Sequence, residues 1–126
     1  MRISVRRIAL TWVMLGGLAV LPGCDVLRVF FPSSDHDEVA PALPEDLGSP
    51  AVLIFSKTNG FRHTEAIDSG LPAFEAMAVK RDWSTFATEN GAIHNAEDLA
   101  KFDAIVWFNV SGDVLAEDQR LSLIHI

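Results

Sequence analysis

The stretch Val52-Leu-Ile-Phe-Ser-Lys-Thr-Asn-Gly-Phe-Arg-His63 decides the fold of this chain. Its apolar residues run directly into a polar turn, which is the pattern of a buried strand that ends in a loop. In open α/β sheets, ligands bind in the crevice beyond the carboxyl ends of the strands. We therefore expect a parallel sheet whose ligand site begins in this loop.

Strands and helices alternate on either side of this turn. Residues 51–56 form a continuous apolar run, typical of a strand buried on both faces. Apolar residues at helical spacing predict a helix over residues 64–80, with Thr64 as its N-cap. Gly70 and Pro72 interrupt this pattern, so we expect a kink or two short helices there. The other predicted elements are a strand over 83–88, a short helix, a strand over 104–109 and a helix from 115. The short helix starts at Asn95, with Asp98 at the third position in a weak version of the capping box.

This order predicts an α/β fold with right-handed crossovers. Parallel pairing in the order 2-1-3 places the first strand between the other two. The folded part, residues 51–120, has only about half the length of a typical doubly wound domain, so the sheet is expected to be truncated after its third strand. We expect an exposed apolar edge there and poor stability of the isolated fragment. A sharp thermal transition from a soluble monomer would contradict this.

The first residues have the pattern of an export signal. In residues 1–23, three arginines precede an apolar run over residues 8–20 that is too short to span a bilayer. Cys24, the only cysteine, follows directly, and the segment resembles a bacterial lipoprotein signal. That resemblance implies cleavage before Cys24, lipid on its sulfur and anchoring in the cell envelope, whether in the inner or the outer membrane. An ordinary secretory signal with a chance cysteine is the alternative.

Residues 24–50 are predicted to be an acidic tether, because they contain four prolines and show no sustained period. His36 lies in an acidic run that could suggest a metal, but a solvated tether is the interpretation we favour. Three of the ten basic residues and none of the seventeen acidic ones lie in residues 1–23, so the remainder has a net charge of −10. This charge argues against nucleic acid and anionic lipid surfaces as partners.

The last six residues, 121–126, are expected to be foreign to the protein. Leu-Ser-Leu-Ile-His-Ile is what the transposon end used in sequencing-library preparation encodes in this frame. We therefore expect an adapter artefact and a reading frame truncated near Arg120. A natural apolar tail is the alternative, and genomic codons that follow Arg120 and end in a stop would establish it.

The loops after strands 1 and 3 carry the candidate site. Because the carboxyl ends of these strands are neighbours in a 2-1-3 sheet, residues 57–63 and 109–113 should face each other across one crevice. Lys57 and Arg62 could hold an anion or polarise a carbonyl, and His63 could act as general acid or base. The candidate binding residues are Thr58, Gly60, Phe61, Asn109, Gly112 and Asp113.

Several of these residues have simpler interpretations. Arg62 could pair with Glu65 or Asp113 to hold the loops together. The role of His63 could be limited to capping or stabilising its loop. His94, beyond strand 2, is predicted to be a surface residue. The sequence lacks the dinucleotide fingerprint, the phosphate loop, the nucleophile elbow, the zinc-protease helix motif and paired cysteines. No cofactor or metal is therefore expected.

Three blocks of this sequence resemble the ThuA-like, or trehalose-utilisation, family. They are the opening stretch, Phe102-Asp-Ala-Ile-Val-Trp-Phe-Asn109 and Ser111-Gly-Asp-Val-Leu115. The resemblance covers residues 51–120, the amino-terminal half of the family's domain. It implies a flavodoxin-like α/β fold similar to class I glutamine amidotransferases but without their cysteine triad, so amidotransferase activity is not expected. Val110 stands where many members have threonine, which weakens any catalytic role for a hydroxyl there.

The resemblance also implies a sugar ligand. Our first hypothesis is an envelope-anchored carbohydrate-active protein, an enzyme acting on a sugar or keto-disaccharide. The second is a non-catalytic sugar-binding module that uses the same crevice. The third is a structural lipoprotein without a ligand.

Overall fold

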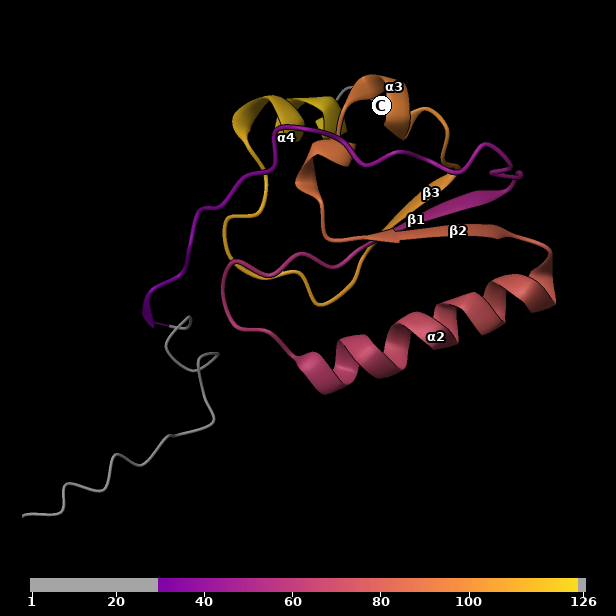
Figure 1. Ribbon diagram of the computed structural model, residues 1–126, viewed down its shortest axis with the longest axis horizontal. Coiled ribbons are helices and arrows are strands. Elements are labelled where there is room, and N and C mark those ends of the chain that lie inside the picture. Colours follow the sequence, from indigo (N-terminus) through magenta and orange to yellow (C-terminus); the bar gives the residue numbers. More distant parts are fainter. Residues whose placement is uncertain (1–29, 125–126) are drawn as a thin grey trace, which may run out of the picture.

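The apolar run of the opening stretch forms the central strand, β1 (Ala51–Phe55). This computed structural model describes residues 30–124, so the predicted export signal and Cys24 lie outside the described residues. β1 pairs in parallel with β2 (Ser84–Thr88) on one side and with β3 (Ala104–Trp107) on the other (Figure 1). The predicted α/β class and the strand order 2-1-3 are therefore confirmed.

Helices cover both faces of this small sheet (Figure 1). The long helix α2 (Thr64–Arg81) lies along one face. The 3₁₀ turn η1 (Gly91–Ile93) and the helices α3 (Ala96–Leu99) and α4 (Glu117–Ile124) lie over the other. Within residues 30–124, no helix is both long enough and apolar enough to cross a membrane.

The core is densest on the face covered by η1, α3 and α4. Leu53 of β1 packs against Ile93 and Leu99, while Phe55, two residues along the same face of the strand, packs against Val114 and Leu115. All six side chains are almost completely buried. Each such burial stabilises the fold by about 1.5–3 kcal/mol, so β1 anchors two clusters at once.

The α2 helix is continuous, so of the two expected outcomes, a kink or two short helices, the second is wrong. Pro72 lies inside the helix and cannot donate a hydrogen bond to the carbonyl of Asp68, one turn earlier. Both residues are exposed, so water can satisfy that carbonyl. The predicted cap is also wrong, because Thr64 is the first helical residue and His63 takes the cap position without a side-chain bond.

The β3 strand is shorter than predicted and only partly covered. It ends at Trp107, whose side chain is 46% exposed. Within the described chain β3 pairs with β1 alone, so its other edge is open, as expected from the truncated order. The following residue, Phe108, packs its ring against Phe74 of α2 and over Gly70, where an added Cβ would lie only 2.3 Å from the ring. Gly70 is therefore needed for close packing of α2 on this end of the sheet.

Residues 33–39, which we call the strap, cross the η1 side of the molecule before the chain enters β1 (Figure 1). A backbone hydrogen bond joins Ser33 N–H to Asn59 O at 2.9 Å, and the side chain of Gln119 in α4 donates to the carbonyl of Asp37 at 2.7 Å. These contacts were not predicted, because the prolines and the lack of a sustained period in residues 24–50 are typical of a tether. The strap is in fact attached to the domain at several points.

Candidate functional site

The loops that follow β1 and β3 are neighbours, as predicted, but they are in direct contact. Thr58 and Ser111 form an isolated parallel bridge, and Ser111 O accepts from the N–H groups of Asn59 and Gly60 at 2.8 and 3.1 Å. The Ser111 hydroxyl donates to Phe61 O at 2.6 Å. The expected open crevice between these loops is therefore replaced by a hydrogen-bonded seam.

Glycine is required in this seam. Gly112 has φ +78°, and a Cβ there would lie 2.6 Å from the backbone nitrogen of Gly60. Gly60 and Gly112 thus let the two backbones approach each other. Their role in the structure is loop-to-loop packing.

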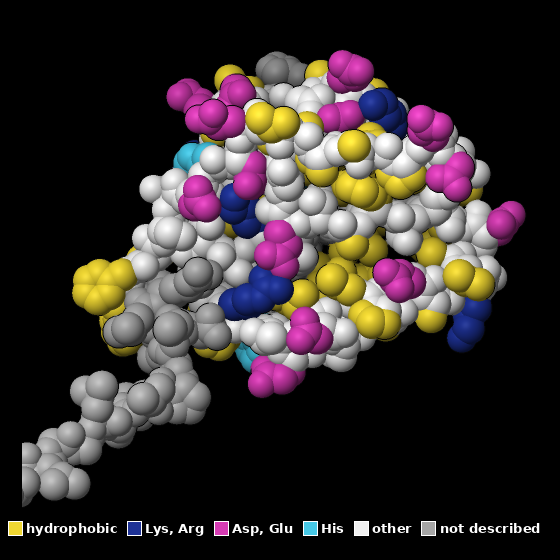
Figure 2. Space-filling view, in the orientation of Figure 1, with side chains coloured by type: hydrophobic (Ala, Val, Ile, Leu, Met, Phe, Trp, Pro, Cys, Tyr) yellow, Lys and Arg dark blue, Asp and Glu magenta, His cyan; other side chains and the backbone are white. Residues whose placement is uncertain are grey.

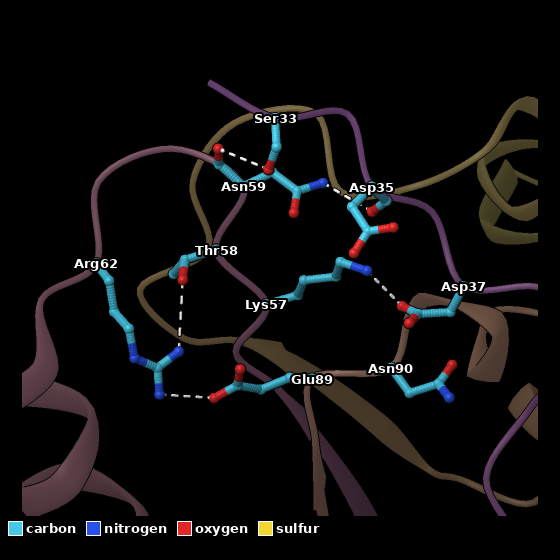
Figure 3. Close-up of a pocket in the computed structure, with 9 residues that line it drawn as sticks. All are labelled: Ser33, Asp35, Asp37, Lys57, Thr58, Asn59, Arg62, Glu89 and Asn90. Carbon is cyan, nitrogen blue, oxygen red and sulfur yellow. Dashed lines mark hydrogen bonds and ion pairs between the residues drawn. The ribbon is translucent and has the colours of Figure 1, made fainter. Parts of the chain in front are cut away.

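A polar pocket lies instead between the β1 loop, the end of β2 and the strap (Figure 3). Its volume of about 380 Å³ falls within the roughly 300–1,000 Å³ of small-molecule sites. Its lining residues are all polar: Ser33, Asp35, Asp37, Lys57, Thr58, Asn59, Arg62, Glu89 and Asn90. The pocket thus brings together four residues of the β1 loop, Lys57, Thr58, Asn59 and Arg62, with side chains from the strap and from the end of β2.

Lys57 is the most buried charged group of the pocket, at 7% exposure. Its ammonium donates to Asp37 Oδ2 of the strap at 2.5 Å, and the same oxygen accepts from Gly91 N–H at 2.7 Å. Burial alone would raise the pKa of Asp37, but the hydrogen bonds from Lys57 and Gly91 outweigh it and hold that pKa below its ordinary value. The Asp37 carboxylate is therefore ionised and pairs with Lys57.

Arg62 forms the opposite side of the pocket, where its charge is paired with an acidic side chain from the end of β2. Its guanidinium donates to Glu89 Oε1 at 2.7 Å and to Thr58 Oγ1 at 3.4 Å (Figure 3). Glu89 directly follows β2, which the strand order places beside β1. The same strand order that makes the β1 and β3 loops neighbours therefore also brings the end of β2 to the β1 loop.

Asn59 connects three segments and is only 3% exposed. Its side-chain amide donates to Asp35 O of the strap at 2.9 Å and to Asp113 O of the β3 loop at 2.5 Å. Its own carbonyl accepts from Ser33 N–H. Asn59 fixes the strap against the seam and so shapes the pocket wall.

His63 does not line the pocket. It is exposed at the start of α2, and its ring stands edge-on to that of Phe61 with 5.2 Å between centroids. Phe61 is 40% exposed and is likewise outside the pocket lining. Of the three predicted catalytic residues, the structure brings together Lys57 and Arg62 and leaves His63 apart.

The predicted binding residues of the β3 loop lie away from the pocket as well. Asn109 has φ +52°, a conformation that asparagine tolerates better than most residues, which accounts for its presence without a ligand. The Asp113 carboxylate pairs with Arg120 and lies 3.4 Å from His36 Nε2. A hydrogen bond from Arg120 holds the pKa of Asp113 below its ordinary value. Asp113, Gly112 and Arg120 line a separate hollow beside α4.

His94 is buried, and its predicted surface position is wrong. Its side chain is completely inaccessible and its ring stands edge-on to Phe55 and Trp107, at 4.5 and 5.6 Å between centroids. Nδ1 lies 3.1 Å from Gly91 O, whereas Nε2 has no partner within the described chain. Burial lowers the pKa of His94. The η1 turn places it there by folding back over the ends of β1 and β3.

Six pocket residues were not among the candidates predicted from the sequence, namely Ser33, Asp35, Asp37, Asn59, Glu89 and Asn90. Glu89 and Asn90 follow a predicted strand, so the rule applied to β1 would have found them. The strap residues carried no comparable signal. Acidic side chains are scattered over the face in Figure 2, and nothing in the sequence separates Asp35 and Asp37 from the others.

Metal binding finds no support in residues 30–124, where no three histidine, cysteine, aspartate or glutamate side chains form a group that could hold an ion. His36, the histidine of the acidic run, belongs to no such group, and the ion pair recorded for it is with Asp113. The polar pocket therefore offers hydrogen-bonding groups and two ion pairs as its chemistry.

A model of a protein family described as trehalose utilisation matches residues 51–125. No curated protein and no solved structure matches the chain. The matched region contains the three strands, the β1 loop and the end of β2, whereas the strap precedes it.

Proposed function

The chain belongs to the ThuA, or trehalose-utilisation, family, and from this premise we propose that it binds a small sugar in the polar pocket beside β1. The family points to a role related to trehalose utilisation. A sugar or keto-disaccharide is the ligand class that we propose for this chain. The position of the pocket at the carboxyl ends of β1 and β2 is where α/β sheets bind ligands.

The observation that carries this proposal is the all-polar lining of the pocket. Sugars present many hydroxyl groups, each of which donates one hydrogen bond and accepts others. The carboxylates of Asp35 and Glu89 can accept from hydroxyls, and the amide of Asn90 can donate and accept. Such a lining suits a polyhydroxylated ligand better than an apolar one.

Binding can be measured by titration calorimetry of the full chain with trehalose and with its keto derivative. Glu89→Gln removes one charged acceptor without changing the shape of the side chain, so we expect about tenfold weaker binding. Glu75→Gln, on the exposed surface of α2, is the matched control and should bind like the parent protein. Absence of binding by the parent protein would contradict the proposal.

Catalysis on the bound sugar is our first hypothesis for the activity, with Lys57 and Arg62 supplying charge. A non-catalytic sugar-binding module is the second, and it is favoured by the position of His63 outside the pocket and by the ion pairs of both cations. Turnover screening on keto-disaccharides, with His63→Ala alongside, separates the two. Turnover by the parent protein supports an enzyme, and its loss in His63→Ala would assign His63 a part in it. Binding that survives the substitution without any turnover supports a module.

We also propose that lipid on Cys24 attaches the protein to the cell envelope. The support is the sequence pattern of residues 1–24. A chain carrying two or more acyl groups is anchored stably, whereas a single acyl chain gives only reversible attachment. Incorporation of labelled palmitate into the parent protein but not into Cys24→Ser, together with loss of the variant from the membrane fraction, is the expected result. Equal labelling of both would contradict it.

A further inference from the structure

The pocket extends beyond the part of the chain that matches the family. The match begins at residue 51, yet Ser33, Asp35 and Asp37 of the strap line the same pocket as Lys57. In Figure 3 the Lys57 side chain extends across the pocket toward Asp37 rather than toward Arg62. The strap is therefore part of the pocket wall.

Asp37 makes the central contacts of the strap. Its Oδ2 accepts from Lys57 Nζ at 2.5 Å and from Gly91 N–H at 2.7 Å. Its backbone carbonyl accepts from Gln119 Nε2 at 2.7 Å. These three contacts fix the carboxylate from three directions, so the Lys57 ammonium is held at one place at the edge of the pocket.

The pocket lining contains more acidic than basic side chains. Asp35, Asp37 and Glu89 are acidic and Lys57 and Arg62 are basic, so the lining has one net negative charge. Each basic group is paired with a carboxylate. A phosphate or carboxylate on a ligand would meet this negative charge and would have to compete with Asp37 for Lys57. A neutral sugar needs neither the displacement of a carboxylate nor the burial of a new charge.

We propose that Asp37 is a positioning residue of the sugar site, which holds Lys57 and makes the pocket select uncharged sugars over phosphorylated or acidic ones. The inference rests on the proposed sugar-binding function. It assigns part of that function to the strap, outside the family's matched region. Asp37 acts through Lys57, whose ammonium faces the ligand.

Asp37→Asn separates the charge of this residue from its role as an attachment point. The asparagine carbonyl oxygen can still accept from Gly91 N–H, and the backbone bond to Gln119 is unchanged. Only the negative charge opposite Lys57 is removed. Asp46→Asn in the same acidic segment is the matched control, because Asp46 is exposed and does not line the pocket.

The measurement is titration calorimetry of the full chain with trehalose and with trehalose 6-phosphate. For Asp37→Asn we expect about tenfold weaker binding of trehalose, because Lys57 is no longer held in place. We expect about tenfold tighter binding of trehalose 6-phosphate, because the charge of Lys57 is no longer neutralised. Asp46→Asn should change neither affinity. If the role of Asp37 is purely structural, the substitution would weaken the binding of both ligands together.

Amine labelling reports on Lys57 without any sugar. With a small acylating reagent and mass spectrometry, Lys57 of the parent protein should react more slowly than the exposed Lys80, and Asp37→Asn should react about tenfold faster at Lys57 than the parent protein. If Lys57 reacts like Lys80 in the parent protein, the pairing is overturned. Should Asp37→Asn fail to fold, Asp35→Asn removes a second pocket charge and is expected to tighten phosphate binding in the same direction.

The possible outcomes are distinct. Opposite changes for the two ligands support the inference. Parallel changes, or none, overturn it and leave the sugar-binding function standing. Binding of neither ligand by the parent protein overturns the proposed function itself, and the inference with it.

Discussion

β1 and β3 are both composed of apolar residues, yet β1 is buried along nearly its whole length while β3 leaves Trp107 46% exposed. The two strands differ in their neighbours. β1 lies between two strands and beneath two core clusters, whereas β3 has a partner on one side only within residues 30–124. Apolar composition therefore predicts a strand, but the number of neighbours determines how far that strand is buried.

The largest expected effect tests this comparison directly. Leu53 and Ile105 are partners in the β1–β3 register, and Leu53 is fully buried while Ile105 is partly exposed. Leu53→Ala should lower the free energy of unfolding by about 3–5 kcal/mol, and Ile105→Ala by about half as much. Because a small domain has only about 5 kcal/mol to lose, Leu53→Ala is expected to be largely unfolded. Urea unfolding followed by circular dichroism measures both, and equal losses would contradict the comparison.

The seam between the loops after these strands offers the second test. Gly112→Ala forces an alanine to φ +78° and brings its Cβ against the backbone of Gly60, so we expect a loss of about 1–3 kcal/mol in unfolding free energy. Gly48→Ala is the control, because its Cβ would meet only the Ser84 hydroxyl, whose rotation would break no more than one exposed hydrogen bond from Gly48 N–H. If the two substitutions cost the same in urea unfolding, the seam does not depend on backbone contact.

His94 provides a pH-dependent test, since its ring packs on Phe55 of β1 and on Trp107 of β3. Burial lowers its folded pKa below the ordinary 6.5, so the unfolded chain binds the proton more readily. Stability should therefore fall as pH drops below 6.5, with a slope of at most about 1.4 kcal/mol per pH unit from this group.

His94→Gln is expected to remove that slope. Asp37, Asp98 and Asp113 have pKa values held below 3.8, so their contributions are lost only at more acidic pH and do not interfere. His63→Gln is the matched control because that side chain is exposed. Urea unfolding at several pH values between 5 and 7.5 measures the slope, and an unchanged slope in His94→Gln would show that another group causes it.

The smallest expected effect concerns α3, which covers β1 and β3 through Leu99. Asn95 caps this helix by accepting from Asp98 N–H at 2.9 Å, as the sequence predicted. Asn95→Ala should cost about 1 kcal/mol of unfolding free energy. Glu97→Ala, at an exposed position of the same short helix, is the control and should lower the unfolding free energy by only a few tenths of a kcal/mol. If Asn95→Ala does not lower the unfolding free energy, α3 is held by Leu99 alone.

Local pattern was sufficient to predict the strands and their order. The apolar run of β1, the alternation of β2 and the Asn95 cap all depend on residues close in sequence, and each is found in the structure. The neighbouring positions of the loops after β1 and β3 followed from strand order. The helix is not divided at Pro72, because the tolerance of a proline depends on whether water reaches the carbonyl that it leaves unpaired.

The pocket could be predicted only in part, because its partners come from distant segments. Lys57 and Arg62 were identified, but their carboxylate partners, Asp37 and Glu89, were not. Asp37 lies in a proline-containing acidic stretch that has the composition of a tether, and its contacts depend on where the whole segment crosses the fold. His94 was misplaced for a related reason, since only the path of η1 turns its ring inward.

The contacts of Asp37 also bear on when the site forms during folding. They join residues 20, 54 and 82 positions away along the chain. Closing loops of such length costs chain entropy that is recovered only after the distant elements are in place. We therefore expect the β1–β2–β3 sheet to assemble before the strap docks, so that Lys57 acquires its partner last. Sugar binding would then serve as a kinetic reporter of complete folding, delayed relative to the appearance of secondary structure.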